Sequence, residues 1–242
     1  MLPGRNLVNP RQIANMIVYK VINGALTKTE AAIPTVTEGE VLVKIHAVSL
    51  NYRDLLVTEG VGQWKPMENR IPVSDAAGEV VQTGSAARKF VIGDRVTTLI
   101  LPNWVNGKLT QEKLKGALGG SARDGVLAEY VALPEQALAK FPDYLSYAQA
   151  ATLPVAGLTA WNAAVEQSTL KLGDTMLIIG TGGVSIFALQ FAKLAGYRTI
   201  MTSSDDQKLE KVRQLGAHFT INYRKNPHWI EEVLHITGGQ GV

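Results

Sequence analysis

The stretch Met176-Leu177-Ile178-Ile179-Gly180-Thr181-Gly182-Gly183-Val184-Ser185 decides the fold of the second half of the chain. Its first four residues form an apolar run without alternation, which is typical of a buried strand in a parallel sheet. From Val184 to Ala195, apolar residues recur at helical spacing. The glycines between them permit a tight turn and let the backbone approach a phosphate group. The stretch therefore predicts a strand, a phosphate-binding turn and a helix, with Ser185 replacing the third glycine of the usual pattern.

The residues that follow repeat the alternation of strand and helix. Residues 199–202 and 219–222 have the pattern of strands, residues 208–215 have that of a helix, and Pro227 is suited to open another. A β-α-β-α-β-α order implies a doubly wound parallel sheet. A helix that starts at such a turn offers unpaired N–H groups and a partial positive charge to phosphates. We therefore expect a dinucleotide to bind at Gly180, Thr181, Gly182, Gly183 and Val184.

The end of the second predicted strand bears on the choice of nucleotide. An NAD site places a carboxylate there to hold the ribose hydroxyls, whereas this chain has Ser203 and Ser204. Lys208 could reach a 2′-phosphate as a point charge, and an ordinary solvated surface lysine is the alternative interpretation of that residue. Asp205 and Asp206 argue for NAD, but capping the next helix is the simpler role for them. The residues favour NADP(H), with NAD(H) as the alternative.

Residues 1–150 have the pattern of a β-rich domain. Short strands punctuated by glycine and proline are expected at 40–48, 78–84, 95–100 and 127–133, and many such strands suggest a small barrel. Residues 102–125 contain several glycines and little periodicity, which predicts a long surface loop. Alanine-rich helical segments begin near residue 148. We therefore divide the chain into a β-rich domain at 1–150 and a nucleotide-binding α/β domain at 151–242.

Composition excludes several classes of protein. The chain has 242 residues and no cysteine, which rules out disulfides and thiolate zinc sites. The basic residues are scattered, so no nucleic-acid partner is expected, and no apolar run is long enough for a membrane span. We expect a cytoplasmic protein. A mitochondrial location is the weaker alternative, because Arg5 and Arg11 precede the first acidic residue, Glu30.

Motifs of one family follow each other along the chain. They are Ala76-Ala77-Gly78-Glu79-Val80, Gly93-Asp94-Arg95-Val96, Ala150-Ala151-Thr152-Leu153 through Gly157-Leu158-Thr159-Ala160-Trp161, and Gly180-Thr181-Gly182-Gly183-Val184. Over about residues 16–242 the chain resembles medium-chain dehydrogenases/reductases, in particular quinone-oxidoreductase-like and zinc-type alcohol-dehydrogenase-like members. The resemblance implies a GroES-like barrel, then a Rossmann domain, with the active site in the cleft between them.

The resemblance also implies that no zinc is bound. Zinc-dependent members take a Cys ligand where this chain has Asn51 and a His ligand at about Ser74, and the four-Cys lobe of those members is absent. Asn51-Tyr52-Arg53-Asp54 matches an element of zinc-free members in which the Asn lies near the nicotinamide ribose.

Further site residues follow from the same resemblance. Thr159 matches a threonine near the nicotinamide, and Lys208 and Tyr223 match positions that hold the adenosine 2′-phosphate in NADPH-dependent quinone reductases. The implied reaction is hydride transfer between NADP(H) and a carbonyl, quinone or activated alkene. Without a metal, the oxyanion needs protein donors. Tyr52 is the first candidate, with Asn51 and Arg53 behind it; an aromatic wall is an equal reading of Tyr52.

Only about three of the six strands of a full Rossmann domain are expected before Val242. We therefore expect a C-terminally truncated member of the family. An inactive or non-catalytic nucleotide-binding homologue is the alternative function. The sequence does not name the small-molecule substrate. Members of the family often form dimers through an edge of the Rossmann sheet, but we expect that edge to be missing here, so the sequence does not fix the oligomeric state and a homodimer stays open as a partner.

Overall fold

The structure, a computed structural model, describes residues 15–62, 68–120 and 122–242. The chain divides into two compact units, one ending at Val155 and the other beginning at Ala156. The basic start with Arg5 and Arg11, on which the mitochondrial alternative depends, lies outside the described residues. Among those residues, no helix combines the length and the apolar character that crossing a membrane requires.

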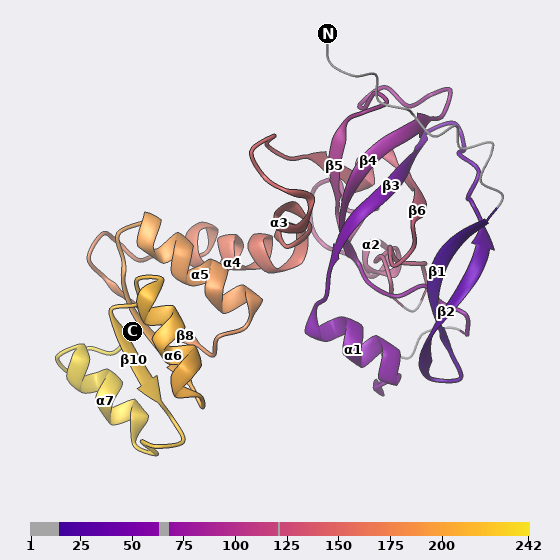
Figure 1. Cartoon of the computed structure of the whole chain (residues 1–242). Coiled ribbons are helices and arrows are strands. Elements are labelled where there is room, and N and C mark those ends of the chain that lie inside the picture. The colour runs from indigo at the N-terminus through magenta and orange to yellow at the C-terminus, as the bar shows by residue number, and fades with distance from the viewer. Residues whose placement is uncertain (1–14, 63–67, 121) are drawn as a thin grey trace, which may run out of the picture. The chain divides into compact units, whose positions relative to one another are not determined.

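The first unit is built on a five-stranded antiparallel sheet in the order β6-β3-β4-β5-β7 (Figure 1). Its strands are β3 (Glu40–Ser49), β4 (Asp75–Thr83), β5 (Arg95–Thr98), β6 (Tyr130–Pro134) and β7 (Leu138–Lys140). Valines of β3, β4 and β5, among them Val43, Val80 and Val96, form the main buried core. The expected β-rich domain is therefore present, and β4 begins three residues earlier than the sequence pattern indicates.

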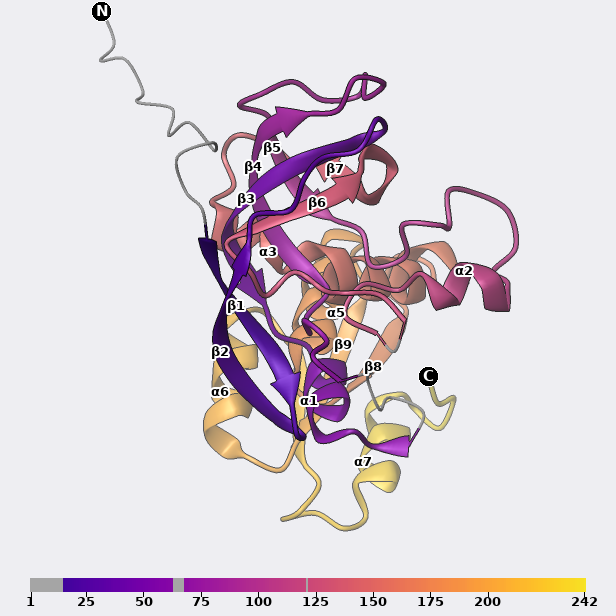
Figure 2. The ribbon, with the colours of Figure 1, turned by 90° about the vertical axis from the view of Figure 1, so that its right-hand side faces the viewer.

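A separate hairpin precedes this sheet. β1 (Asn15–Ile22) pairs with β2 (Ala25–Ala32) along its whole length, and Figure 2 shows the long curved hairpin clearly. Asn23 and Gly24 form the turn, with φ values of 51° and 73°. Both values lie in the left-handed region, which Asn and Gly tolerate, as a tight hairpin turn requires.

Short helices complete the first unit. α1 (Tyr52–Glu59) follows β3 directly, and α3 (Tyr147–Ala151) packs against β3 and β4 through Ala150 and Ala151, which bury against Ala77. A 3-10 turn, η3 (Glu135–Ala137), connects β6 and β7. α1 therefore starts where β3 ends, which places the residues around Asn51 at one end of the sheet.

The expectation of a surface loop at 102–125 is wrong in part. The segment contains the helix α2 (Gln111–Lys115), and Leu118, Gly119 and Gly125 are buried. Leu118 N donates a hydrogen bond to Ile100 O at 2.9 Å, and Gly125 N donates one to Ile71 O at 2.7 Å. Gly119 and Gly125 are required because they lie directly on the backbone of residues 72–73, where a Cβ would stand within 3.0 Å of backbone atoms.

The second unit contains a parallel sheet in the order β10-β9-β8. The strands are β8 (Thr175–Ile179), β9 (Arg198–Ser203) and β10 (Phe219–Asn222). Helices α5 (Gly183–Leu194) and α6 (Asp206–Gln214) pack on the face that carries Ile178 and Met201. Helix α7 (Trp229–Ile236) packs on the other face, against Ile200 and Ile221. The unit has the expected β-α-β-α-β-α topology.

The alanine-rich segment after α3 is helical but not uniform. Two π-helical turns, η4 (Leu153–Gly157) and η5 (Asn162–Glu166), flank the single turn α4 (Leu158–Trp161). Single π-helical turns occur often at functional sites. Thr159, the expected nicotinamide contact, lies on α4 and is exposed.

Candidate functional site

The glycine-rich turn joins β8 to α5, as the sequence indicates. Gly180 has φ +81°, a conformation that strains other residues, and Gly182 is the N-cap of α5. A Cβ added at Gly182 would meet no atom within 4 Å, and one at Gly180 would meet only Ser185 Oγ at 4.0 Å. The turn therefore borders open space at the start of a helix, where a phosphate group fits.

Ser185 closes the turn on the other side. Its hydroxyl donates a hydrogen bond to Ile179 O at 3.0 Å, the last carbonyl of β8. A small side chain at this position lets the start of α5 lie close to the strand. Ser185 thus permits the close helix–strand packing that the third glycine gives in the usual pattern.

The end of β9 lies beside the end of β10. Ser203 is buried, and its carbonyl accepts a hydrogen bond from Tyr223 N at 3.1 Å. Asp205 caps α6 by accepting hydrogen bonds from the backbone N–H groups of Gln207 at 2.8 Å and Lys208 at 3.2 Å. The Lys208 side chain is exposed and makes no ion pair within the described part of the chain. The structure therefore places Ser203, Ser204, Lys208 and Tyr223 at or just after the carboxyl ends of β9 and β10.

A second group of polar residues surrounds the start of α1 in the first unit. Asn51 is the N-cap, and its backbone N–H donates to Asp54 Oδ2 at 2.8 Å. Tyr52 is 75% exposed. Arg53 is partly buried and its Nη2 donates to the carbonyl of Leu118. Of the expected oxyanion donors, Tyr52 is thus accessible, while Arg53 is tied to the backbone of the segment that follows α2.

The carboxyl groups behind Arg53 are buried. Asp75, at the start of β4, is 0% exposed, and accepts hydrogen bonds from Ser74 Oγ at 2.7 Å and Val155 N at 3.1 Å. Burial raises the pKa of Asp75, and the hydrogen bond from Ser74 and the positive charge of Arg53 oppose that shift without cancelling it. Burial also raises the pKa of Asp54, against the Asn51 N–H hydrogen bond and the Arg53 charge. Both acids stabilise the arrangement of Arg53 and the start of α1.

Asn51 connects these acids to the site. Its side-chain amide favours the ionised form of Asp75 and so opposes the raised pKa of that carboxyl, while the buried Nδ2 makes no hydrogen bond within 3.5 Å to the described residues. The sequence indicated Asn51 and Asp54 but not Asp75. A carboxylate inside the otherwise apolar run Asp75-Ala76-Ala77 was the available signal, because a buried strand rarely carries an uncompensated charge.

The backbone that leads to Asp75 is unusual. Val73 has φ +73° and is 2% exposed, an outlying conformation for a β-branched residue. Gly119 and Gly125 lie against it, and a Cβ on Gly125 would stand 2.0 Å from Val73 O. The segment after α2 therefore holds residues 72–73 in the conformation from which Ser74 and Asp75 continue.

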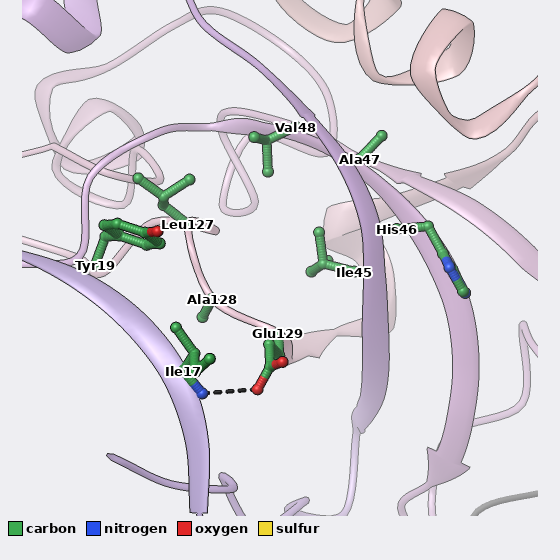
Figure 3. A pocket seen from close by; sticks show the side chains of 9 residues that line it. All are labelled: Ile17, Tyr19, Ile45, His46, Ala47, Val48, Leu127, Ala128 and Glu129. Carbon is green, nitrogen blue, oxygen red and sulfur yellow. Dashed lines mark hydrogen bonds between the residues drawn. The ribbon is translucent and has the colours of Figure 1, made fainter. Parts of the chain in front are cut away.

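A shallow hollow of about 220 Å³ lies elsewhere in the first unit, between β1, β3 and residues 127–129 (Figure 3). Most of its lining is apolar. Glu129 Oε2 already accepts a hydrogen bond from Ile17 N at 2.7 Å, and His46 lies on the other side of β3, stacked on Tyr147 with ring centroids 4.4 Å apart. We assign no reaction to this hollow, because its carboxylate, Glu129, is already engaged by the backbone of β1.

Metal ligands are not grouped in the described residues. No cluster of three or more His, Cys, Asp or Glu side chains could hold an ion there. Asn51 and Ser74 occupy the expected zinc-ligand positions, and both side chains lie close to the carboxyl group of Asp75. An amide and a hydroxyl are not the ligands that zinc prefers.

Two family descriptions match the chain. Residues 37–143 match the alcohol dehydrogenase GroES-like domain, and residues 183–242 match the family described as zinc-binding dehydrogenase. The first match covers the five-stranded sheet, and the second covers α5 through the last residue. The GroES-like identity of the first unit, expected from sequence motifs, is confirmed.

Individual relatives agree with these matches. The chain is 42% identical over 233 residues to a zinc-type alcohol dehydrogenase-like protein of Schizosaccharomyces pombe, covering 93% of this chain and 66% of the relative. It is 27% identical over 216 residues to a quinone oxidoreductase of Homo sapiens, covering 89% and 59%. The crystal structure of an NAD-dependent alcohol dehydrogenase matches with a TM-score of 0.82 at 33% identity, covering 94% of this chain and 68% of that one.

A GroES-like unit followed by a parallel α/β unit with a glycine-rich first turn defines a two-domain, dinucleotide-binding class of protein. The chain belongs to the medium-chain dehydrogenase/reductase family within that class. It spans less than two thirds of the length of the human quinone oxidoreductase that it matches.

Proposed function

We propose that the chain acts as an oxidoreductase that transfers hydride between NADP(H) and a small-molecule carbonyl, quinone or activated alkene, without zinc. Relatives named alcohol dehydrogenase and quinone oxidoreductase support this reaction class. The residues at the ends of β8, β9 and β10 support the choice of cofactor. A bound nicotinamide supplies or accepts the hydride, and the protein contributes binding, orientation and electrostatics.

The open turn at Gly180 and Gly182 is the observation that carries the proposal. Its empty side and the start of α5 fit a pyrophosphate, which the Thr181, Gly182, Gly183 and Val184 region would hold through backbone N–H groups. The neighbouring strand ends in Ser203-Ser204 rather than in a free carboxylate. A 2′-phosphate beside Lys208 and Tyr223 would therefore meet two hydroxyls at the end of β9, and the next acid along the chain, Asp205, is engaged in capping α6.

We assign the substrate oxygen to the start of α1. Tyr52 is exposed and carries an O–H donor, so it can stabilise negative charge on that oxygen. Asn51 and Thr159 are assigned to the nicotinamide end of the cofactor. For Arg53 we propose a positioning role in place of the expected donation to the substrate, because its Nη2 donates to the carbonyl of Leu118 and two carboxyl groups lie nearby.

The zinc-free part of the proposal follows from residue chemistry. Asn51 and Ser74 replace the ligands of zinc-dependent members, and the chain has no cysteine. We expect elemental analysis of the dialysed protein to find no stoichiometric zinc, and we expect chelators to leave activity unchanged. Retention of one zinc per chain after dialysis would contradict this part.

The cofactor choice is tested at Lys208. A charge-assisted contact contributes about 1.5–3 kcal/mol, so Lys208→Ala should weaken NADPH binding by roughly tenfold or more. NADH binding should not change. Lys171→Ala removes the same charge just before β8, at the amino end of the parallel strands, and serves as the control. Equal losses for both nucleotides, or tighter NADH binding by the wild type, would show that the 2′-phosphate is not read here.

The reaction class needs a separate measurement. NADPH oxidation should be followed with a quinone, an enone and a ketone as acceptors. If the wild type turns over any of these acceptors and the Tyr52→Phe variant does so more slowly, the result supports hydride transfer at the assigned site. Tight NADPH binding without turnover of any acceptor would instead favour the non-catalytic nucleotide-binding alternative.

A further inference from the structure

We propose that Lys225 is a positioning residue for cofactor specificity: it binds Asp206 and turns that carboxylate toward β10, which lets the start of α6 accept a 2′-phosphate. This inference rests on the proposed NADP(H) binding and adds a residue that acts on the cofactor through another side chain.

Two carboxylates stand at the start of α6, where they oppose an anionic ligand. Asp205 is engaged in capping the helix. Asp206 is bound on both oxygens: the ammonium of Lys225 contacts Oδ2, and Asn222 Nδ2 donates to Oδ1 at 2.6 Å. The contact with Lys225, followed by that with Asn222, lowers the pKa of Asp206. Asp206 is therefore ionised and is held by β10 and the turn after it.

The turn that follows β10 fixes Lys225 in this position. The Asn222 carbonyl accepts hydrogen bonds from Lys225 N at 3.1 Å and Asn226 N at 2.9 Å, and Asn222 Oδ1 accepts one from Arg224 N at 3.0 Å. One residue thus organises the turn with its backbone and Oδ1, and binds Asp206 with its Nδ2. Asn222 and Lys225 form a clamp on Asp206.

The clamp changes the charge that a 2′-phosphate meets. A phosphate monoester carries about −1.5 to −2 charges at neutral pH, so an unpaired Asp206 would repel it. With Lys225 bound, the pair is neutral. Lys208 and Arg224, whose side chains make no ion pair within the described residues, then leave this edge positive. Because the pair is exposed, its influence is modest and is screened by salt.

The experiment measures NADPH and NADH dissociation constants by calorimetry at low ionic strength. It uses the full chain as wild type, Lys225→Gln, Asp206→Asn, the double variant and Lys171→Gln. Lys225→Gln should weaken NADPH about two- to fivefold and leave NADH unchanged. Asp206→Asn should not weaken NADPH, and the double variant should bind it as Asp206→Asn does. Raising the salt concentration should shrink the effect of Lys225→Gln. Lys171→Gln, which removes the same charge at the amino end of the parallel strands, should resemble the wild type.

Three results would overturn the inference. The first is an unchanged NADPH-to-NADH ratio in Lys225→Gln. The second is a double variant as weak as Lys225→Gln, because Lys225 would then contact the phosphate itself. The third is an equal loss in Lys171→Gln, because only net charge would then matter. A wild-type chain that binds NADH more tightly than NADPH would refute the proposed NADP(H) preference itself. That outcome is distinct from the three above, which concern only Lys225. Circular dichroism of each variant checks that the fold is retained.

Discussion

Asp75 shows how a single residue sets the chemistry of its surroundings. It has no exposed surface, and its oxygens accept hydrogen bonds from Ser74 and from Val155, which lies 80 residues away in the chain. Burial nevertheless raises its pKa above the ordinary value of 3.8. The folded state therefore binds this proton more tightly than the unfolded state. The stability from Asp75 is fully present below pH 3.8 and is lost as the pH rises through the raised pKa.

Asp75→Asn should remove this part of the pH dependence. The substitution costs about 1–3 kcal/mol because an amide NH2 faces donors, and the difference from wild type should be largest at low pH. Urea unfolding from pH 4 to pH 7 measures it. Asp54 titrates in the same direction, so the slope should fall without vanishing. Asp143→Asn, at a side chain that is 99% exposed, is the control. A difference between Asp75→Asn and wild type that stays constant with pH would contradict the assignment.

At the scale of elements, the segment after α2 acts as a support for β4. A Cβ on Gly125 would lie 2.0 Å from Val73 O and 2.4 Å from Pro72 O, and both are backbone atoms that cannot move aside cheaply. Gly125→Ala should therefore cost about 1–3 kcal/mol or more in the free energy of unfolding, and Tyr52-dependent turnover should fall as the start of β4 shifts. Gly39→Ala, where a Cβ meets nothing within 4 Å, is the matched control. Equal stabilities of the two variants would show that the segment gives β4 no support.

The elements that the sequence revealed are those with local patterns. The glycine turn and the strands β8, β9 and β10 are each specified within a few neighbouring residues, and each was found. The sequence named Asp205 and Asp206 as caps of the next helix, and the structure shows that Asp205 is the cap. The hairpin of β1 and β2 was missed although Asn23-Gly24 marks its turn. The burial of Gly119 and Gly125 could not be predicted, because it depends on contacts with Pro72 and Val73 that are distant in sequence.

The candidate site divides in the same way. Asn51, Tyr52 and Lys208 belong to short motifs, so the sequence indicated them. Arg53 also belongs to the motif of Asn51 and Tyr52, but its hydrogen bond to the carbonyl of Leu118, 65 residues away, could not be predicted from it. Contacts of this length arise from packing of the whole unit, and a local pattern does not contain them. The clamp on Asp206 also depends on packing between distant segments, because Asp206 follows β9 whereas Lys225 follows β10.

At the scale of the whole molecule, the proposed contacts with the pyrophosphate and the adenosine end of the cofactor lie in only one of the two compact units. The residues assigned to the pyrophosphate and the adenosine end, at 180–184, 203–208 and 223, all belong to the unit that begins at Ala156. The hairpin of β1 and β2 belongs to the other unit and carries none of the assigned residues. A ligand that binds only the folded state stabilises that state by RT ln(1 + [L]/Kd), about 2.7 kcal/mol at a hundredfold excess over Kd. Local openings that do not disturb the bound ligand are unaffected by it.

NADPH should therefore slow amide hydrogen exchange unevenly along the chain. Protection should concentrate at residues 180–185, which form the glycine-rich turn, and at residues 203–208, which include the start of α6. The amides of residues 15–32 should exchange at their ligand-free rate. Lys208→Ala at the same NADPH concentration should lose most of the protection at 203–208 and keep more of it at 180–185, because the pyrophosphate contacts remain. Mass spectrometry of peptides reads out both regions in one sample. Uniform protection of both units, or none at 180–185, would contradict the placement of the dinucleotide on the edge formed by β8, β9 and β10.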